Sequence, residues 1–192
     1  MQKLTREDLM PLETYSVERN SFREKVINHK QFRRIGLGPN LNLYFEDRLT
    51  MQYQIQEMLR VERIFEADAI QEELDTYNAL IPDGTNLKAT MMLEYVDIEQ
   101  RRQALTQLIG IENTLWLQVG SGGKVYAIAD EDLERSDDDK TSAVHFIRLE
   151  LGEAAHLARS GAKIKLGVDH ANYQHELELT EDQHNALVAD LN

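Results

Sequence analysis

Residues 44–65 constrain the fold of this chain most, because a strand pattern and a long helical pattern meet there. A β-prone run ends at Glu46, and a helical pattern begins near Thr50. The helical part is apolar on more than one side, yet it carries four charged residues within seven positions: Glu57, Arg60, Glu62 and Arg63. An unpaired charge inside a protein costs too much free energy to persist. We therefore expect these charges to be paired or functional.

Two interpretations of this polar cluster stay open. In the first, an arginine fork holds a carboxylate or phosphate, and a carboxylate with a raised pKa acts as an acid or a base. In the second, a buried salt-bridge network fixes how the hairpin and the helix dock. The second is favoured, because structural ion pairs produce the same pattern. The residues assigned to this ligand-binding or structural cluster are Glu46, Arg48, Gln54, Glu57, Arg60, Glu62 and Arg63.

The composition limits the class of protein. With 192 residues, of which 42% are hydrophobic, the chain can form one large domain or two small ones around a sizeable core. No stretch approaches the roughly 20 apolar residues that a membrane helix needs. The first residues lack the apolar region of a signal peptide. We therefore expect a cytoplasmic protein with no membrane partner.

Charge and cysteine content narrow the chemistry further. The chain has no Cys, which removes disulfides, thiol catalysis and cysteine-held clusters. The net charge of −13 disfavours binding to nucleic acid and favours a partner with a basic surface. The basic cluster at residues 29–34 runs against this trend, and we interpret it as a solvated turn.

The hydrophobic periods predict an α+β fold, because strands do not alternate regularly with full-length helices. N-terminal helices and a β-hairpin lead into a long helix, with a break before its end left open, and a mixed or antiparallel sheet with short helices follows. We expect a single α+β domain over residues 1–192, with a possible division into a helical and hairpin part (1–82) and a β-rich part (83–192).

The individual elements follow from periodicity, capping boxes and Gly or Pro stops. Expected helices cover residues 17–29, 50–80, 98–109 and 153–159, with a short helix opened at Thr5 and a last helix opened at Thr180. Expected strands cover residues 34–37, 41–45, 87–95, 114–119, 124–129, 143–151, 162–168 and 173–179. The acidic run 131–140 is expected to be an exposed, mobile loop.

Metal and catalytic motifs are weak in this sequence. The one local group of His and carboxylate residues is Asp169, His170 and His175, but its spacing matches no standard ligand motif, and an ordinary turn is favoured over a metal site. His145 alternates with apolar residues, which is typical of a hydrogen-bonded core histidine. No common hydrolase motif occurs. We expect no cofactor, and whether the chain is an enzyme stays open.

Several segments resemble an uncharacterised bacterial family, the domain of unknown function 3501 family. They are residues 4–9, 43–48, 54–64, 89–95 and 166–170, of which the segment Gln-Ile-Gln-Glu-Met-Leu-Arg-Val-Glu-Arg-Ile at 54–64 is the longest and most specific. The chain departs from the family at Asp47, where Asn is expected, and at Ala171, where Pro is common. The family has no assigned reaction.

Members of that family are often encoded beside rubrerythrin-like di-iron proteins and Fe–S oxidoreductases. The resemblance therefore implies a non-enzymatic accessory subunit of a bacterial redox or peroxide-defence system, with a di-iron or Fe–S protein as its partner. The alternative function, from the residues themselves, is a small-molecule binding protein or enzyme that holds a carboxylate or phosphate with Glu57, Arg60, Glu62 and Arg63.

Overall fold

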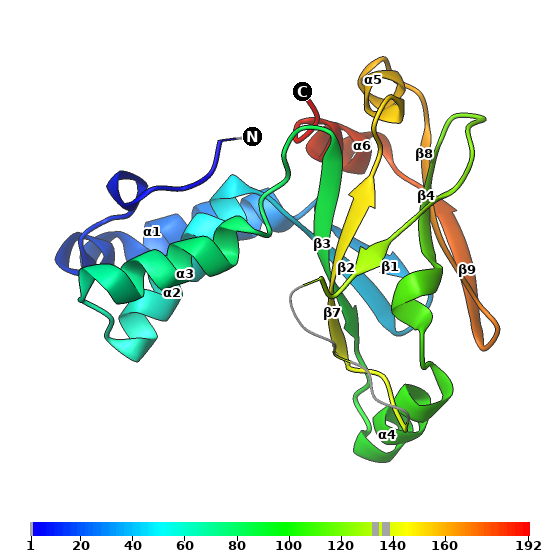
Figure 1. Cartoon of the computed structure of the whole chain (residues 1–192), viewed down its shortest axis with the longest axis horizontal. Coiled ribbons are helices and arrows are strands. Elements are labelled where there is room, and N and C mark those ends of the chain that lie inside the picture. Colours follow the sequence, from blue (N-terminus) through cyan, green and yellow to red (C-terminus); the bar gives the residue numbers. More distant parts are fainter. Residues whose placement is uncertain (1, 132–134, 136–138) are drawn as a thin grey trace.

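The fold is α+β, as predicted, with a group of helices beside two antiparallel sheets. The structure, a computed structural model, describes residues 2–131, 135 and 139–192. The predicted acidic loop over 131–140 lies mostly outside the described residues. Helices α1 (Leu12–Lys30), α2 (Arg48–Glu62) and α3 (Ala67–Asn78) gather on one side of the sheets (Figure 1).

Two sheets make up the β part. Sheet A has the strand order β1-β2-β3-β7-β6, and sheet B has the order β5-β4-β8-β9. The strands of sheet A are β1 (Arg34–Leu37), β2 (Leu41–Glu46), β3 (Asn86–Leu93), β7 (Val144–Glu150) and β6 (Ile128–Ala129). Those of sheet B are β5 (Val125–Tyr126), β4 (Leu115–Val119), β8 (Ile164–His170) and β9 (Tyr173–Glu178). The predicted hairpin β1–β2 is confirmed.

Short helices surround the sheets. The helix α4 (Ile98–Gln107) ends before Gly110, whose φ of 82° begins the turn of η2 (Ile111–Thr114). Near the other end of the sheets lie α5 (Ala154–Arg159) and α6 (Glu181–Val188), and the short turn η1 (Arg6–Asp8) precedes α1 (Figure 1). The predicted capping boxes at Thr5 and Thr180 are both present.

The main core lies between the two sheets. In β3 the residues Leu87, Ala89 and Met91 are buried, while Lys88, Thr90 and Met92 are only half-buried, as the period of a strand requires. They pack in one cluster with Leu117 of β4 and Leu166 of β8. A second, smaller core joins the N-terminal segment to α2 and α3, and a third lies between α1 and α2.

The expected helix over 50–80 is two helices. Helix α2 ends at Glu62, and Arg63 follows it in the left-handed conformation with φ 55° and ψ 47°. The backbone N–H of Ile64 then donates to the carbonyl of Leu59 over 3.0 Å, which closes the helix in the usual way. The chain resumes as α3 at Ala67, so the break allowed for in the sequence falls between residues 63 and 66.

The prediction of one strand over residues 124–129 is wrong. Val125 and Tyr126 pair with β4 in sheet B, whereas Ile128 and Ala129 pair with β7 in sheet A. Between them, the N–H of Ala127 donates to the carbonyl of Leu115 over 2.9 Å. This segment passes from one sheet to the other, and strand period alone does not reveal such a crossing.

A buried ion network joins the helices to the rest of the chain. The guanidinium of Arg33 donates from Nη1 and Nη2 to the two carboxylate oxygens of Asp190, both at 2.7 Å. Its Nη2 also lies 3.1 Å from Asp47, which caps the N-terminus of α2. His29 contacts the same oxygen of Asp47. The interpretation of residues 29–34 as a solvated turn is therefore wrong for Arg33, which is only 3% exposed.

Tyr173 ties the β1–β2 hairpin to sheet B. Its hydroxyl donates to the carbonyl of Leu37 over 2.7 Å and accepts from the N–H groups of Asn40 and Leu41. We expect Tyr173→Phe to lower the free energy of unfolding by about 1–3 kcal/mol, because buried backbone groups lose their partner. Urea unfolding measures this. The control Tyr126→Phe removes an exposed hydroxyl, and an equal loss in that variant would contradict the assignment.

Candidate functional site

Glu57 is the centre of the polar cluster predicted on α2. Its carboxylate accepts hydrogen bonds from the hydroxyl of Tyr15 at 2.6 Å and from Nε and Nη2 of Arg19, both at 2.8 Å. Arg60, one turn along α2, adds two longer contacts of 3.3 and 3.1 Å. The side chain of Glu57 is 17% exposed, so the network lies at the edge of the α1–α2 contact.

The electrostatics of this network suit a structural ion pair. The hydrogen bonds from Arg19 lower the pKa of Glu57 to about 2, although partial burial opposes them. Burial and the neighbouring carboxylate raise the pKa of Tyr15 above its ordinary value. Glu57 is thus ionised and satisfied near neutral pH, which does not suit a general acid. The arrangement favours the structural interpretation of Glu57 and Arg60, and ligand binding there stays a hypothesis.

The low pKa of Glu57 predicts a pH dependence of stability. A carboxylate whose pKa falls on folding stabilises the native state above its ordinary pKa of 4.5, and this contribution is lost as the pH falls toward 2. We expect wild type to lose stability relative to Glu57→Gln over this range. Urea unfolding of both proteins between these pH values measures it. A constant difference between the two proteins would contradict the assignment.

The other predicted cluster residues lie in separate places. Glu46 is buried in β2 and accepts a hydrogen bond of 2.9 Å from Thr90 of β3. Arg48, at the start of α2, pairs with Asp8 at 2.5 Å. Gln54 is half-buried on α2, and the exposed residues Glu62 and Arg63 lie at its end. The seven residues therefore do not converge on one site.

The side chains of Asp169, His170 and His175 contact different partners. Asp169 accepts from Trp116, Lys124 and Tyr126, and His170 contacts the carbonyl of Ile109 at 3.2 Å. His175 stacks edge-on against Tyr173, with ring centroids 4.8 Å apart. Within the described residues, no group of three His, Asp or Glu side chains is arranged to hold a metal.

His145 is a satisfied core residue, as predicted. Its ring is fully buried, with Nδ1 2.5 Å from a carboxylate oxygen of Asp130 and Nε2 2.9 Å from the hydroxyl of Thr141. These contacts occupy both ring nitrogens. Neither nitrogen is therefore left to act as a metal ligand or an accessible base in this arrangement.

Amide side chains hold the N-terminal segment against α2 and α3. Asn78 bonds both to the N–H of Leu4 at 2.8 Å and to its carbonyl at 2.9 Å. Gln56 does the same to Met10, at 2.5 and 3.3 Å. Gln52 donates to the carbonyl of Asp8 at 2.6 Å. Because these amides supply partners to backbone groups of residues 4–10, that segment is held as one wall above the two helices.

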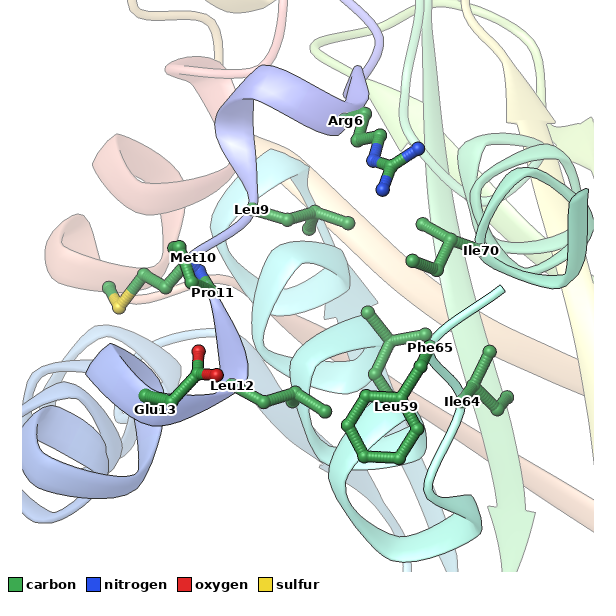
Figure 2. A pocket seen from close by; sticks show the side chains of 10 residues that line it. All are labelled: Arg6, Leu9, Met10, Pro11, Leu12, Glu13, Leu59, Ile64, Phe65 and Ile70. Carbon is green, nitrogen blue, oxygen red and sulfur yellow. The ribbon is translucent and has the colours of Figure 1, made fainter. Parts of the chain in front are cut away.

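An open apolar cavity of about 290 Å³ lies between that wall and the α2–α3 turn. We call it the terminal groove. Figure 2 shows Leu9 and Ile70 pointing toward each other across it, with Leu12 and Leu59 beneath and Arg6 and Glu13 at its border. Phe65 is 65% exposed although it lines the groove. An exposed aromatic ring beside a hollow of aliphatic side chains is typical of a contact surface.

The groove lining holds one Arg and one Glu, Arg6 and Glu13, but the chain that continues from it through α3 is acidic. Residues 64–87 contain no Lys or Arg, and their acidic residues are Glu66, Asp68, Glu72, Glu73, Asp75 and Asp83. Burial, together with the like charges of Glu62 and Glu72, raises the pKa of Glu73. Glu73 therefore lies among like charges, and such a cluster attracts cations.

Arg63 sits in a backbone conformation that disfavours side chains. Only Gly adopts positive φ without strain at a helix end, and another residue costs roughly 1–2 kcal/mol. We expect Arg63→Gly to raise the free energy of unfolding by up to about 1 kcal/mol, since Gly also has greater freedom in the unfolded chain. Thermal unfolding measures it, with Arg60→Gly as the control, which should destabilise. A loss of stability in Arg63→Gly would mean that its side chain makes stabilising contacts.

The comparisons with known proteins place this chain in a family. The family model "Protein of unknown function (DUF3501)" matches residues 3–191. The chain belongs to that family. The matched range includes the α2 segment with the Glu57 network and the N-terminal segment beside the groove. No curated protein matches the chain.

A solved structure shares the whole fold. It is the crystal structure of a novel protein of unknown function from Burkholderia pseudomallei K96243, at 1.90 Å resolution. The two chains are 47% identical, the match covers 100% of each, and the TM-score is 0.94. The arrangement of helices beside two sheets is therefore shared by two chains that are 47% identical.

Sequence reasoning did not find the terminal groove. Its walls come from the N-terminal segment, the start of α1, the end of α2 with the turn after it, and the start of α3. The only signal was the apolar pair Ile64 and Phe65 directly after a charged stretch. When the helix is expected to continue past residue 62, such an apolar pair is assigned to the buried face of that helix.

Proposed function

We propose that this protein is a non-enzymatic accessory subunit that binds a protein partner in its terminal groove. The partner surface is a basic, amphipathic segment whose apolar side chains enter the hollow. The family resemblance supports a di-iron or Fe–S protein of a redox or peroxide-defence system as that partner. In this proposal the complex acts in the cytoplasm. Among the described residues, no helix is long and apolar enough to cross a membrane.

The main observation that supports the proposal is the exposure of the Phe65 side chain. Covering an aromatic side chain contributes about 25 cal/mol for each Å² of apolar surface removed from water. Ile64 and Ile70 beside it are only half-buried, so a partner would cover further apolar surface. Aromatic residues surrounded by aliphatic ones are the usual anchors of protein interfaces.

The charge around the groove sets the kind of partner. The acidic face of α3 favours Lys and Arg on the opposing surface, and it repels an acidic one. Exposed charges are screened within about 10 Å at 0.1 M salt, so this part of the attraction weakens as salt rises. The whole chain carries the same sign, with a net charge of −13.

The Glu57 cluster supports small-molecule binding less well. Of the two arginines predicted to grip a carboxylate or phosphate there, Arg60 already holds Glu57 together with Arg19, and Arg63 lies exposed beyond the end of α2. An incoming anion would have to displace that carboxylate from Arg19 and Arg60. The groove needs no such displacement, because its apolar side chains already face open space.

The test is recovery of the partner from the native host. A tagged wild-type chain should recover a di-iron or Fe–S protein at about 0.05 M NaCl and less of it at about 0.5 M, because the acidic contacts are screened. Ile64→Ser combined with Phe65→Ser should abolish recovery. Mass spectrometry identifies the protein, and its iron content is measured directly.

The matched control is Val96→Ser, which alters a fully exposed apolar residue away from the groove. It should recover the partner like wild type. Thermal unfolding of both variants shows that the groove variant is still folded. Recovery of the chain alone under all these conditions, or undiminished recovery by the groove variant, would overturn the proposal.

A further inference from the structure

A second cavity lies between the C-terminal end of α3 and the outer face of sheet A. Its volume is about 510 Å³. Tyr77 and Leu80 line it from the helix side, and Phe146 lines it from β7. Three cations, Lys88 of β3, Arg148 of β7 and Arg135, lie in the same lining, together with Glu131. The guanidinium of Arg135 lies 4.6 Å from the centre of the Phe146 ring. Lys88 and Arg148 are neighbours because β3 and β7 pair in a register that sets them opposite each other.

Lys88 and Arg148 have different hydrogen-bond partners. Arg148 donates from Nε and Nη2 to both carboxylate oxygens of Glu131, at 2.7 and 2.6 Å, and it also contacts Glu150. The Nζ of Lys88 instead donates to the backbone carbonyl of Ala79, at 2.5 Å. Across the described ranges 2–131, 135 and 139–192, no carboxylate pairs directly with Lys88.

Lys88 is thus a half-buried cation bonded to a neutral group. Burial lowers its pKa, and the more distant charge of Asp83 only partly opposes that effect. An ammonium removed from water gains most from an anion placed beside it. The carbonyl of Ala79 supplies a dipole at the end of α3, but no full charge.

We propose that this cavity binds a small organic anion with an apolar body. Its carboxylate pairs with Lys88, and its body packs against Tyr77, Leu80 and Phe146. Apolar walls with one or two charged groups are the usual composition of small-molecule sites, and the volume lies within their ordinary range of about 300–1,000 Å³. The ammonium of Lys88 fixes the orientation of the ligand, and the aromatic rings pack against its apolar part.

This site is distinct from the terminal groove. The groove is lined by the N-terminal segment, the start of α1 and the region from the end of α2 to the start of α3. The second cavity is lined by the end of α3, by β3 and β7, and by Glu131 and Arg135. The two sets of lining residues do not overlap. Failure of partner recovery therefore leaves the anion site unaffected, and the reverse also holds.

The test uses octanoate as the probe, titrated into the whole chain by calorimetry. Wild type should bind octanoate more tightly than octanamide, which lacks the charge, or acetate, which lacks the apolar body. Lys88→Gln should weaken octanoate binding about tenfold or more, since a contact to a charged group is lost. Lys163→Gln changes the net charge equally at an exposed position and should bind like wild type.

Phe146→Ala tests the apolar wall without touching the charge. It should weaken octanoate binding while leaving the weak binding of acetate unchanged. Amide chemical shifts of wild type should move at β3, β7 and the end of α3 when octanoate is added, which locates the site even if a variant fails to fold. No saturable binding at millimolar octanoate, equal affinity for octanamide, or shifts confined to other elements would overturn the proposal.

Discussion

The buried guanidinium of Arg33 is the contact on which the arrangement of this molecule depends. It lies where α1 passes into β1, and it holds Asp190 near the C-terminus and Asp47 at the start of α2. A buried Arg held by carboxylates satisfies charges that would each be costly alone. Three segments far apart in sequence thus meet at one planar group. The helices keep a fixed position beside the sheets in part because these carboxylates cannot leave the Arg without a large penalty.

Asp47 both caps the N-terminus of α2 and pairs with the buried Arg33. Its side chain accepts from the N–H of Thr50 at 2.9 Å, which caps α2, and its other oxygen faces Arg33. Burial acts to raise the pKa of Asp47, but His29 and Arg33 outweigh it, so its pKa falls below the ordinary value. The family resemblance leads one to expect Asn here. With Asp, the helix cap also supplies the negative charge that the buried Arg needs.

The two proposed sites lie on the same helix, α3, and use it differently. Near its start, Ile70 contributes to the terminal groove, and the acidic residues that follow set the charge of the surface. At its end, Tyr77 and Leu80 cover part of sheet A and enclose the cavity around Lys88. Both depend on the break after Glu62, because a continuous helix over 50–80 would have carried residues 67–80 away from the N-terminal segment and from the sheet.

The sequence alone determined the local elements wherever the hydrophobic period agrees with the Gly, Pro and helix-capping signals. The hairpin around Gly38, the alternation in β3 and the capping boxes at Thr5 and Thr180 follow from near neighbours, and each is present. His145 was correctly read as a core residue for the same reason, since its strand neighbours show which face is buried. The α+β class follows from the order of these elements.

Only the tertiary structure decided which charges meet. Glu57 and Arg60 are one turn apart, so their pair was visible in the sequence, but Arg19 is 38 positions away and completes the network. Glu46, Arg48 and Glu62 looked like members of the same cluster because they are close in sequence, yet they face three different surroundings. The crossing of residues 125–129 between sheets likewise depends on partners that lie elsewhere in the chain.

The physical reason is the range of the interactions. Helix and strand patterns reflect contacts over a few residues, whereas ion pairs, grooves and cavities form where separate segments are brought together. Arg33 and Asp190 are 157 positions apart, and no periodicity links them. The local sequence therefore determined the elements, and the packing of those elements decided that Phe65 stays exposed and that Lys88 faces a cavity.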